Sequence, residues 1–116
     1  MLEVAATAAD DALAADIVAL DVTALTPFSD TFLIATVDNP RHMRATMNAV
    51  SEAVKKDSGN LPNSVEGDGD AEWVILDYGD LVVHLFTEEG RSFYALEKLW
   101  GDAPRLRFGA DQVTPV

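Results

Sequence analysis

The stretch "WVILDYGDLVVHLF", Trp73–Phe86, decides the fold of this 116-residue chain. It contains two apolar runs rich in branched residues, separated by Gly79-Asp80, which suits a two-residue turn with glycine at its first central position. Counting outward from this turn places Trp73 opposite Phe86. The stretch therefore predicts an antiparallel β-hairpin with a defined register.

The two faces of the predicted hairpin differ in chemistry, because side chains alternate between the faces of a strand. One face is almost wholly apolar and is predicted to pack against helices: Val74, Leu76, Tyr78, Leu81, Val83 and Leu85. The other face mixes aromatic, aliphatic and polar groups: Trp73, Ile75, Asp77, Val82, His84 and Phe86. This second face is too polar for unpartnered burial and too apolar for ordinary wet surface, a composition typical of a binding surface. A second layer of the same chain is the alternative cover for it.

The rest of the chain predicts helices alternating with strands. Helices are expected over 4–15, 40–57 and 87–100, and strands over 16–22, 31–36 and near 64–66. We expect residues 102–116, which show no clear periodicity, to form a mobile tail. The order of elements predicts one small α/β (α+β) domain over residues 1–101, with a mixed sheet of about five strands and helices packed on it.

Capping residues and apolar stripes support two of these helices. Asn39 suits an N-cap before Pro40, and a stripe of large apolar residues follows at helical spacing: Met43, Met47, Val50 and Val54. In the last predicted helix, Thr87 suits the N-cap, and Phe93, Leu96 and Trp100 are expected to share one face.

The charge balance favours a basic protein partner. Twenty acidic residues and eight basic ones give a net charge of −12. Such a surface repels phosphates, so direct nucleic-acid binding is not expected, whereas complementary fields accelerate encounters with basic proteins. Acidity that serves only solubility is the alternative.

Composition also limits the compartment and the chemistry. The chain has no cysteine, which excludes disulfides and thiolate metal sites. We expect neither a signal peptide nor a membrane span, because the N-terminus lacks a basic region and no run approaches the roughly 20 apolar residues that a span needs. A cytoplasmic location is expected.

Candidate catalytic groups are few. His84 beside Asp77 could act as a general base, but the hairpin holds no serine or cysteine nucleophile, so a structural hydrogen bond is the stronger interpretation. His42 is expected to be solvated.

The segment "EGDGD" resembles the start of a calcium loop. The twelfth position from Asp68 is Gly79, where that loop requires glutamate. We expect no catalytic residue, metal or cofactor. The alternative from the enzyme class is a metal-dependent nucleotidyltransferase or phosphohydrolase that uses Asp68, Asp70 and Asp77.

The run "VEGDGDAEWVILDYGDLVVHLFTEEGRSFYALEKLW" resembles the C-terminal signature of the ribosomal silencing factor family, also called RsfS, YbeB or Iojap. The blocks "DIVALDV", "SDTFLIAT" and "NPRHMRATMNAV" are similar to earlier parts of that family in the same order, so the resemblance covers roughly residues 4–101. It implies a small fold related to nucleotidyltransferases but without their catalytic residues.

The resemblance also implies a function. Such a cytoplasmic factor binds the large ribosomal subunit through large-subunit ribosomal protein fourteen (uL14), blocks joining of the small subunit and represses translation when nutrients fall. Members tend to be homodimers when free, and organellar relatives assist large-subunit biogenesis, which is the alternative role.

Seven residues of the signature are carried over as candidate partner contacts: Trp73, Asp77, Asp80, His84, Phe86, Tyr94 and Glu97. Trp73 and Phe86 are expected to be apolar anchors, whereas Asp77 and Asp80 are expected to face basic side chains of the partner. A structural role, holding the last helix to the sheet, is the alternative for Tyr94 and Leu96, and it is the role that we expect for Trp100.

Overall fold

The computed structural model describes residues 1–109 and 112–115. In chain order, the described elements are α1 (Leu2–Asp11), β1 (Ala15–Asp21), β2 (Thr31–Val37), α2 (Pro40–Ser58), β3 (Ser64–Glu66), β4 (Trp73–Asp77), β5 (Leu81–Thr87), α3 (Glu88–Tyr94), α4 (Leu96–Leu99), β6 (Arg105–Gly109) and β7 (Gln112–Pro115). In this part of the chain, no helix is both long and apolar enough to cross a membrane.

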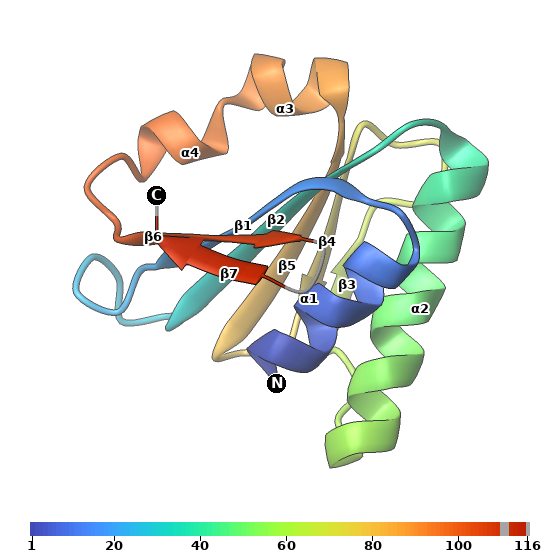
Figure 1. Cartoon of the computed structure of the whole chain (residues 1–116), viewed down its shortest axis with the longest axis horizontal. Helices are drawn as coiled ribbons and strands as arrows, with labels where there is room; N and C mark the ends of the chain where they lie inside the picture. The colour runs from blue at the N-terminus through green and yellow to red at the C-terminus, as the bar shows by residue number, and fades with distance from the viewer. Residues whose placement is uncertain (110–111, 116) are drawn as a thin grey trace.

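The strands form one mixed sheet between two layers of helices. The strand order is β3-β4-β5-β2-β1-β6-β7, and every neighbouring pair is antiparallel except the parallel pair β2 and β5. Figure 1 shows α1 and α2 against one face of the sheet, which we call the helix face, and α3 and α4 over the opposite face. The predicted fold class is confirmed.

The hairpin has the predicted register. Trp73 lies opposite Phe86, and the Tyr78 backbone N–H donates to the Leu81 carbonyl at 2.8 Å. Gly79 has a φ of 89°, the left-handed backbone conformation that favours glycine at this turn. The sequence pattern was sufficient here because turn chemistry and side-chain alternation indicate the same pairing.

The helix face is closed by α1 and α2. All six apolar hairpin residues assigned to it are buried: Val74, Leu76, Tyr78, Leu81, Val83 and Leu85. Helix α2 contributes Met43, Val50 and Val54, each with no exposed surface, and the Asn39 side chain caps its first turn by accepting from the His42 N–H at 2.8 Å. The alanines of α1 allow it to pack closely, since four of them are buried.

The expectation that the His42 side chain is solvated is wrong. Its side chain is 14% exposed, and Nε2 lies 2.7 Å from the Ala12 carbonyl oxygen. The Asp38 backbone N–H donates to Nδ1 at 2.9 Å, so this nitrogen is the acceptor and Nε2 carries the proton that bonds to Ala12. The imidazole therefore links the end of α1 to the start of α2.

The single last helix expected over 87–100 is instead two helices. Ala95 has a φ of 48° and a ψ of 45°, which ends α3 and starts α4 in a new direction. As a result, the prediction that Phe93 shares a face with Leu96 is wrong: the Phe93 side chain is 78% exposed, whereas Leu96 is buried. Helical periodicity could not reveal the break, because alanine is not a residue that marks it.

The expectation of a tail after residue 101 is wrong for most of this segment. Strand β6 pairs with β1, and β7 pairs with β6, which adds two strands to the five that were expected. The pattern that carries β6 is the short alternation of Arg105 and Arg107 with Leu106 and Phe108, where Phe108 packs against the core of the helix face. A run this short, with charged residues at every second position, gives only a weak strand signal.

Candidate partner-binding surface

The face of the sheet beneath α3 and α4 carries the second side of the hairpin, and we call it the aromatic face. Helices α3 and α4 cover it over β1 and the adjoining part of β2, where Leu20, Ile34 and Leu96 are buried. Part of it over β4, β5 and the start of β2 stays accessible, although His84 and Phe86 of β5 are buried. Five half-buried side chains form what we call the open patch: Phe32, Trp73, Ile75, Asp77 and Val82.

Local sequence places α3 tightly beside this patch. Thr87 caps the helix by accepting from the Gly90 N–H at 3.0 Å, and Glu88 and Glu89 favour the positive N-terminal end. A Cβ on Gly90 would lie 2.5 Å from the Glu72 carbonyl oxygen. Glycine at this position therefore allows α3 to begin directly on β5 and to lie close to the chain that enters β4.

Four of the seven predicted contact residues form one aromatic cluster. The Trp73 ring stacks on Phe86, with centroids 5.2 Å apart and an interplanar angle of 21°, and lies 4.8 Å from the Tyr94 ring. His84 completes the cluster at 5.9 Å from Trp73. The cluster joins the β4–β5 hairpin to the end of α3.

His84 is the buried polar group of this cluster. It is 5% exposed, and its Nδ1 accepts from the Trp73 indole N–H at 3.1 Å. Burial lowers the pKa of His84 to about 4, so the imidazole is neutral at pH 7 with its proton on Nε2. Among the described residues, Nε2 has no hydrogen-bond partner, and the Phe32 ring packs edge-on at 4.8 Å.

The two predicted anchors, Trp73 and Phe86, differ in how much of their surface is exposed. Phe86 has no exposed surface in this structure, so its side chain supports Trp73 from below and offers no area of its own. Trp73 is half-buried and Tyr94 is 45% exposed, so both present aromatic surface to solvent. The two interpretations of this face are thus both represented: α3 and α4 cover one half within the chain, and the other half is open.

The two predicted aspartates lie at the turn end of the hairpin. The Asp77 carboxylate accepts from the Gly79 N–H at 2.8 Å, which stabilises the turn. The His84 side chain is hydrogen-bonded to Trp73, so Asp77 is not the residue that orients the imidazole. Asp80 is exposed, and its carbonyl oxygen accepts from the Asp30 and Thr31 N–H groups at 3.0 and 2.9 Å.

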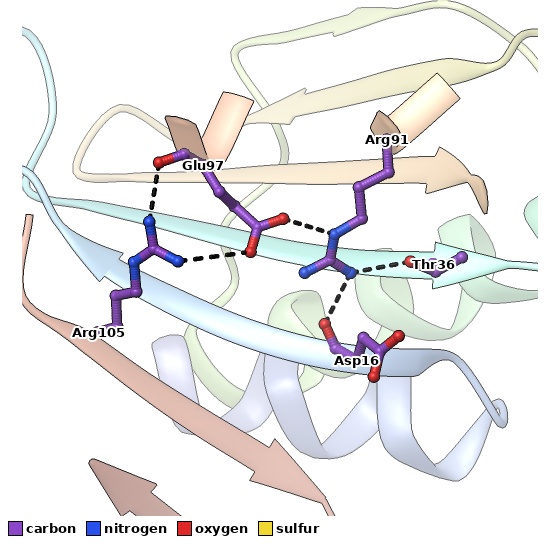
Figure 2. Close-up of polar contacts among 5 residues, drawn as sticks. All are labelled: Asp16, Thr36, Arg91, Glu97 and Arg105. Carbon is purple, nitrogen blue, oxygen red and sulfur yellow. Dashed lines mark hydrogen bonds and ion pairs between the residues drawn. The ribbon is translucent and has the colours of Figure 1, made fainter. Parts of the chain in front are cut away.

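Glu97, the seventh candidate, belongs to an ion-pair network shown in Figure 2. Its Oε1 accepts from Arg91 Nε at 2.7 Å, and its Oε2 lies 3.9 Å from Arg105 Nη1. The hydrogen bond from Arg91 is the largest cause that holds the pKa of Glu97 below its ordinary value, and the positive charges of Arg91, Arg105 and Arg107 lower it further. Arg91 Nη1 also donates to the Asp16 carbonyl oxygen at 2.7 Å and to Thr36 Oγ1 at 2.8 Å.

This network holds α3 and α4 onto the sheet. Arg91 on α3 joins Glu97 on α4 to β1 and β2, while Arg105 Nη2 of β6 donates to the Glu97 backbone carbonyl at 2.9 Å. The Glu97 side chain is 27% exposed and largely committed to the two arginines. The geometry therefore gives Glu97 a positioning role beside the surface.

Sequence reasoning missed two residues of this surface. Phe32 lies next to Val82 across the parallel β2–β5 pair, which could not be paired from a hairpin rule alone. Arg91 was overlooked because its partners are 6 to 75 positions away in the chain. For Phe32, the available signal was an aromatic residue at an alternating position of its strand.

The acidic segment before β4 is a turn. The Asp70 N–H donates to Asp68 Oδ1 at 2.9 Å, and Arg44 Nη1 lies 3.9 Å from Asp70. Within residues 1–109 and 112–115, no three histidine, aspartate or glutamate side chains lie close enough together to hold a metal ion.

The known proteins that this chain resembles belong to one family. A family model described as "Ribosomal silencing factor during starvation" (RsfS) matches residues 1–115. The ribosomal silencing factor RsfS of Bacillus subtilis is 40% identical over 114 residues, which is 97% of this chain and 96% of that relative. The chloroplastic protein Iojap of Arabidopsis thaliana is 34% identical over 101 residues, 84% of this chain and 40% of that protein.

A solved structure agrees with these relatives. The crystal structure of a Chromobacterium violaceum protein matches this fold with a TM-score of 0.81 and 34% identity, covering 86% of this chain and 82% of that one. We expected the segment after residue 101 to lie outside the resemblance to this family. The family model instead extends to residue 115. The chain belongs to the ribosomal silencing factor family, RsfS or Iojap.

Proposed function

We propose that this protein binds the large ribosomal subunit through large-subunit ribosomal protein fourteen, and that the bound protein sterically prevents the small subunit from joining. Translation is thereby repressed when nutrients are limited. We also propose that it acts in the cytoplasm, is not an enzyme, and forms a homodimer when it is free of the ribosome.

The observation that supports this proposal most is the open patch. It places two half-buried aromatic rings, Phe32 and Trp73, beside the half-buried Ile75, Val82 and Asp77 on rigid strands. Aromatic side chains that are held in place and only partly covered are typical anchors of protein interfaces. The net charge of −12 adds complementarity to a basic ribosomal protein.

Steric exclusion requires no chemistry from the chain. His84 is neutral and buried beneath the aromatic rings, and Glu97 is paired with arginines. In the proposed complex, these groups keep Trp73 and Tyr94 in position, and the bulk of the domain occupies space that the small subunit needs.

Sedimentation tests the proposal. The purified protein is incubated with isolated large ribosomal subunits and then with small subunits, and joined ribosomes are separated on a gradient. We expect the protein to move with the large subunit and the joined fraction to fall. Binding without a loss of joining favours the biogenesis role, and absence of binding at moderate salt contradicts the proposal.

Two variants locate the contact. Trp73→Ala is expected to weaken binding to large subunits by about 2 kcal/mol, roughly thirtyfold, as for a desolvated aromatic anchor. Leu99→Ala is the matched control, because Leu99 is 76% exposed on α4 and lies outside the open patch. Circular dichroism and urea titration establish that both variants are folded under the binding conditions. Equal affinities for the two variants would remove Trp73 from the contact.

Calorimetry with divalent metals tests the enzyme alternative. We expect Mg²⁺ and Mn²⁺ to bind only in the millimolar range, since Asp70 lies beside Arg44 and Asp77 is hydrogen-bonded within the hairpin turn. Tight, stoichiometric binding would favour a metal-dependent enzyme instead.

A further inference from the structure

The loop between β1 and β2 exposes a phenylalanine. The Phe28 side chain is 87% exposed, the largest fraction among the large apolar side chains that the structure describes. Figure 1 shows this loop projecting from the end of the sheet. Burying a ring of this size in a partner's pocket would remove a large apolar area from water.

The loop is held firmly to the hairpin turn. The Asp80 carbonyl oxygen accepts from three donors: the Asp30 N–H at 3.0 Å, the Thr31 N–H at 2.9 Å and the Ser29 hydroxyl at 3.0 Å. Ser29 itself is 6% exposed. The residue directly after Phe28 is therefore fixed to the core, which defines where the ring leaves the surface.

Hydrogen bonds inside the loop add to this order. The Phe28 N–H donates to Thr26 Oγ1 at 3.2 Å, and the Thr26 N–H donates to the Val22 carbonyl at 3.0 Å. The Val22 N–H in turn donates to the Asp30 carbonyl at 2.9 Å, which closes the stem. A ring on an ordered loop loses less conformational entropy on binding than one on a flexible loop.

The loop and the hairpin turn that holds it carry charge of one sign. Segments 21–31 and 77–81 contain no lysine, arginine or histidine, and they contain four aspartates: Asp21, Asp30, Asp77 and Asp80. All four are exposed or half-buried. Carboxylates around an apolar ring repel phosphates and anionic membrane surfaces and attract a basic protein surface.

The loop also adjoins the open patch. Strand β2 runs from Thr31 directly into Phe32, and Phe32 pairs with Val82. The loop therefore lies at the end of the strand that contributes Phe32 to the open patch.

We propose that Phe28 is a second apolar anchor of the partner complex, which inserts into a hydrophobic pocket on a basic protein surface of the large ribosomal subunit while the nearby aspartates face its cationic side chains. This inference rests on the proposed function. It adds a contact that the hairpin signature does not contain.

The test measures equilibrium binding of fluorescently labelled protein to isolated large ribosomal subunits at moderate salt. Phe28→Ala is expected to raise Kd at least tenfold. Leu13→Ala is the control, because Leu13 is 81% exposed just before β1, at the opposite end of that strand from the Phe28 loop, and should change Kd less than twofold. Both substitutions remove an exposed apolar side chain, so both variants should keep the thermal stability of the parent protein.

The outcomes separate this inference from the proposed function. Tight binding by the parent protein with an unchanged Kd for Phe28→Ala overturns the second anchor and leaves the proposed function intact. Failure of the parent protein to bind overturns both. Equal losses for Phe28→Ala and Leu13→Ala overturn the anchor as well, since they indicate general hydrophobic adhesion.

Two further binding experiments test the chemistry of the partner. The double variant Asp30→Asn with Asp80→Asn is expected to lower the association rate and its salt dependence; an unchanged salt dependence overturns the electrostatic part. Protein-free ribosomal RNA and phosphatidylcholine vesicles are expected not to bind. Binding to either that is lost in Phe28→Ala overturns the protein partner in favour of RNA or membrane.

Discussion

The two faces of the sheet solve the same packing problem differently. On the helix face, α1 and α2 close over the sheet, and hairpin residues such as Leu85 and Val83 have no exposed surface. On the aromatic face, α3 and α4 are short and cover only part of the sheet, so Trp73 and Val82 are only half-buried. The difference indicates that one face is built for stability, and we propose that the other face serves recognition, although one hairpin supplies both.

The largest expected effect separates the faces directly. Leu85→Ala should lower the free energy of unfolding by about 3–4 kcal/mol, because it leaves a cavity in a closed core. Val82→Ala, on the aromatic face of the same strand, should cost less than about 1 kcal/mol, because its site is already half-open. Urea denaturation measures both. Equal losses would mean that the aromatic face is as closed as the helix face.

Protonation of His84 should also destabilise the protein. Its pKa is about 4 in the folded state and near 6.5 in the unfolded chain, so the unfolded state takes up a proton first as pH falls. Stability should be fully present above pH 6.5 and should fall by about 3 kcal/mol between pH 7 and pH 4.

The variant His84→Gln isolates this contribution, because it does not titrate in that range. Its unfolding free energy should change less with pH than that of the parent protein. Glu97, whose pKa is lowered, loses its stabilising charge at still lower pH and does so in both proteins. Identical pH profiles above pH 4.5 would contradict the assignment of a neutral, buried His84.

The next largest loss of stability is expected for Arg91, because this residue joins α3 and α4 on the aromatic face to the sheet. Arg91→Ala should cost about 2 kcal/mol, since it leaves the Glu97 carboxylate and the Asp16 carbonyl without this donor. A double-mutant cycle with Glu97→Gln, measured by denaturation, should show a favourable coupling of more than about 0.5 kcal/mol. Additive losses would mean that the pair does not act as a unit.

The smallest expected effect lies at the break between α3 and α4. Ala95 has a φ of 48°, which an alanine adopts at a cost and a glycine does not. Ala95→Gly should raise the free energy of unfolding by up to about 1 kcal/mol. The melting temperature should therefore rise slightly. A decrease as large as that of a glycine within a helix would argue that residues 88–99 form one continuous helix.

The helix face and the hairpin were predictable from sequence for a physical reason. The alternation from Trp73 to Phe86 and the stripe of α2 are local periodic signals, and each element buries the side that its pattern marks as apolar. Turn chemistry at Gly79 fixed the register. No long-range information was required.

The candidate surface was predictable only in part, because its geometry depends on contacts far apart in the chain. The sequence indicated Trp73 and the two aspartates, but it could not show that Phe86 is fully covered or that Glu97 is bound by Arg91. Phe28 carries no periodic signal at all. The position of its loop depends on three hydrogen bonds to the Asp80 carbonyl of the hairpin turn. One of the donors, Ser29, lies 51 positions away from Asp80 in the chain, so no local pattern reveals the contact.

The most direct test of the account adds the same charge to each face and measures binding to isolated large ribosomal subunits. Val82→Lys places a cation on the open patch, and Asn48→Lys places one on the exposed side of α2, so the net charge changes equally. With both variants shown to be folded, we predict that Val82→Lys raises Kd at least tenfold and that Asn48→Lys changes it less than twofold. Equal affinities, or a greater loss for Asn48→Lys, would contradict the claim that the aromatic face is the recognition face.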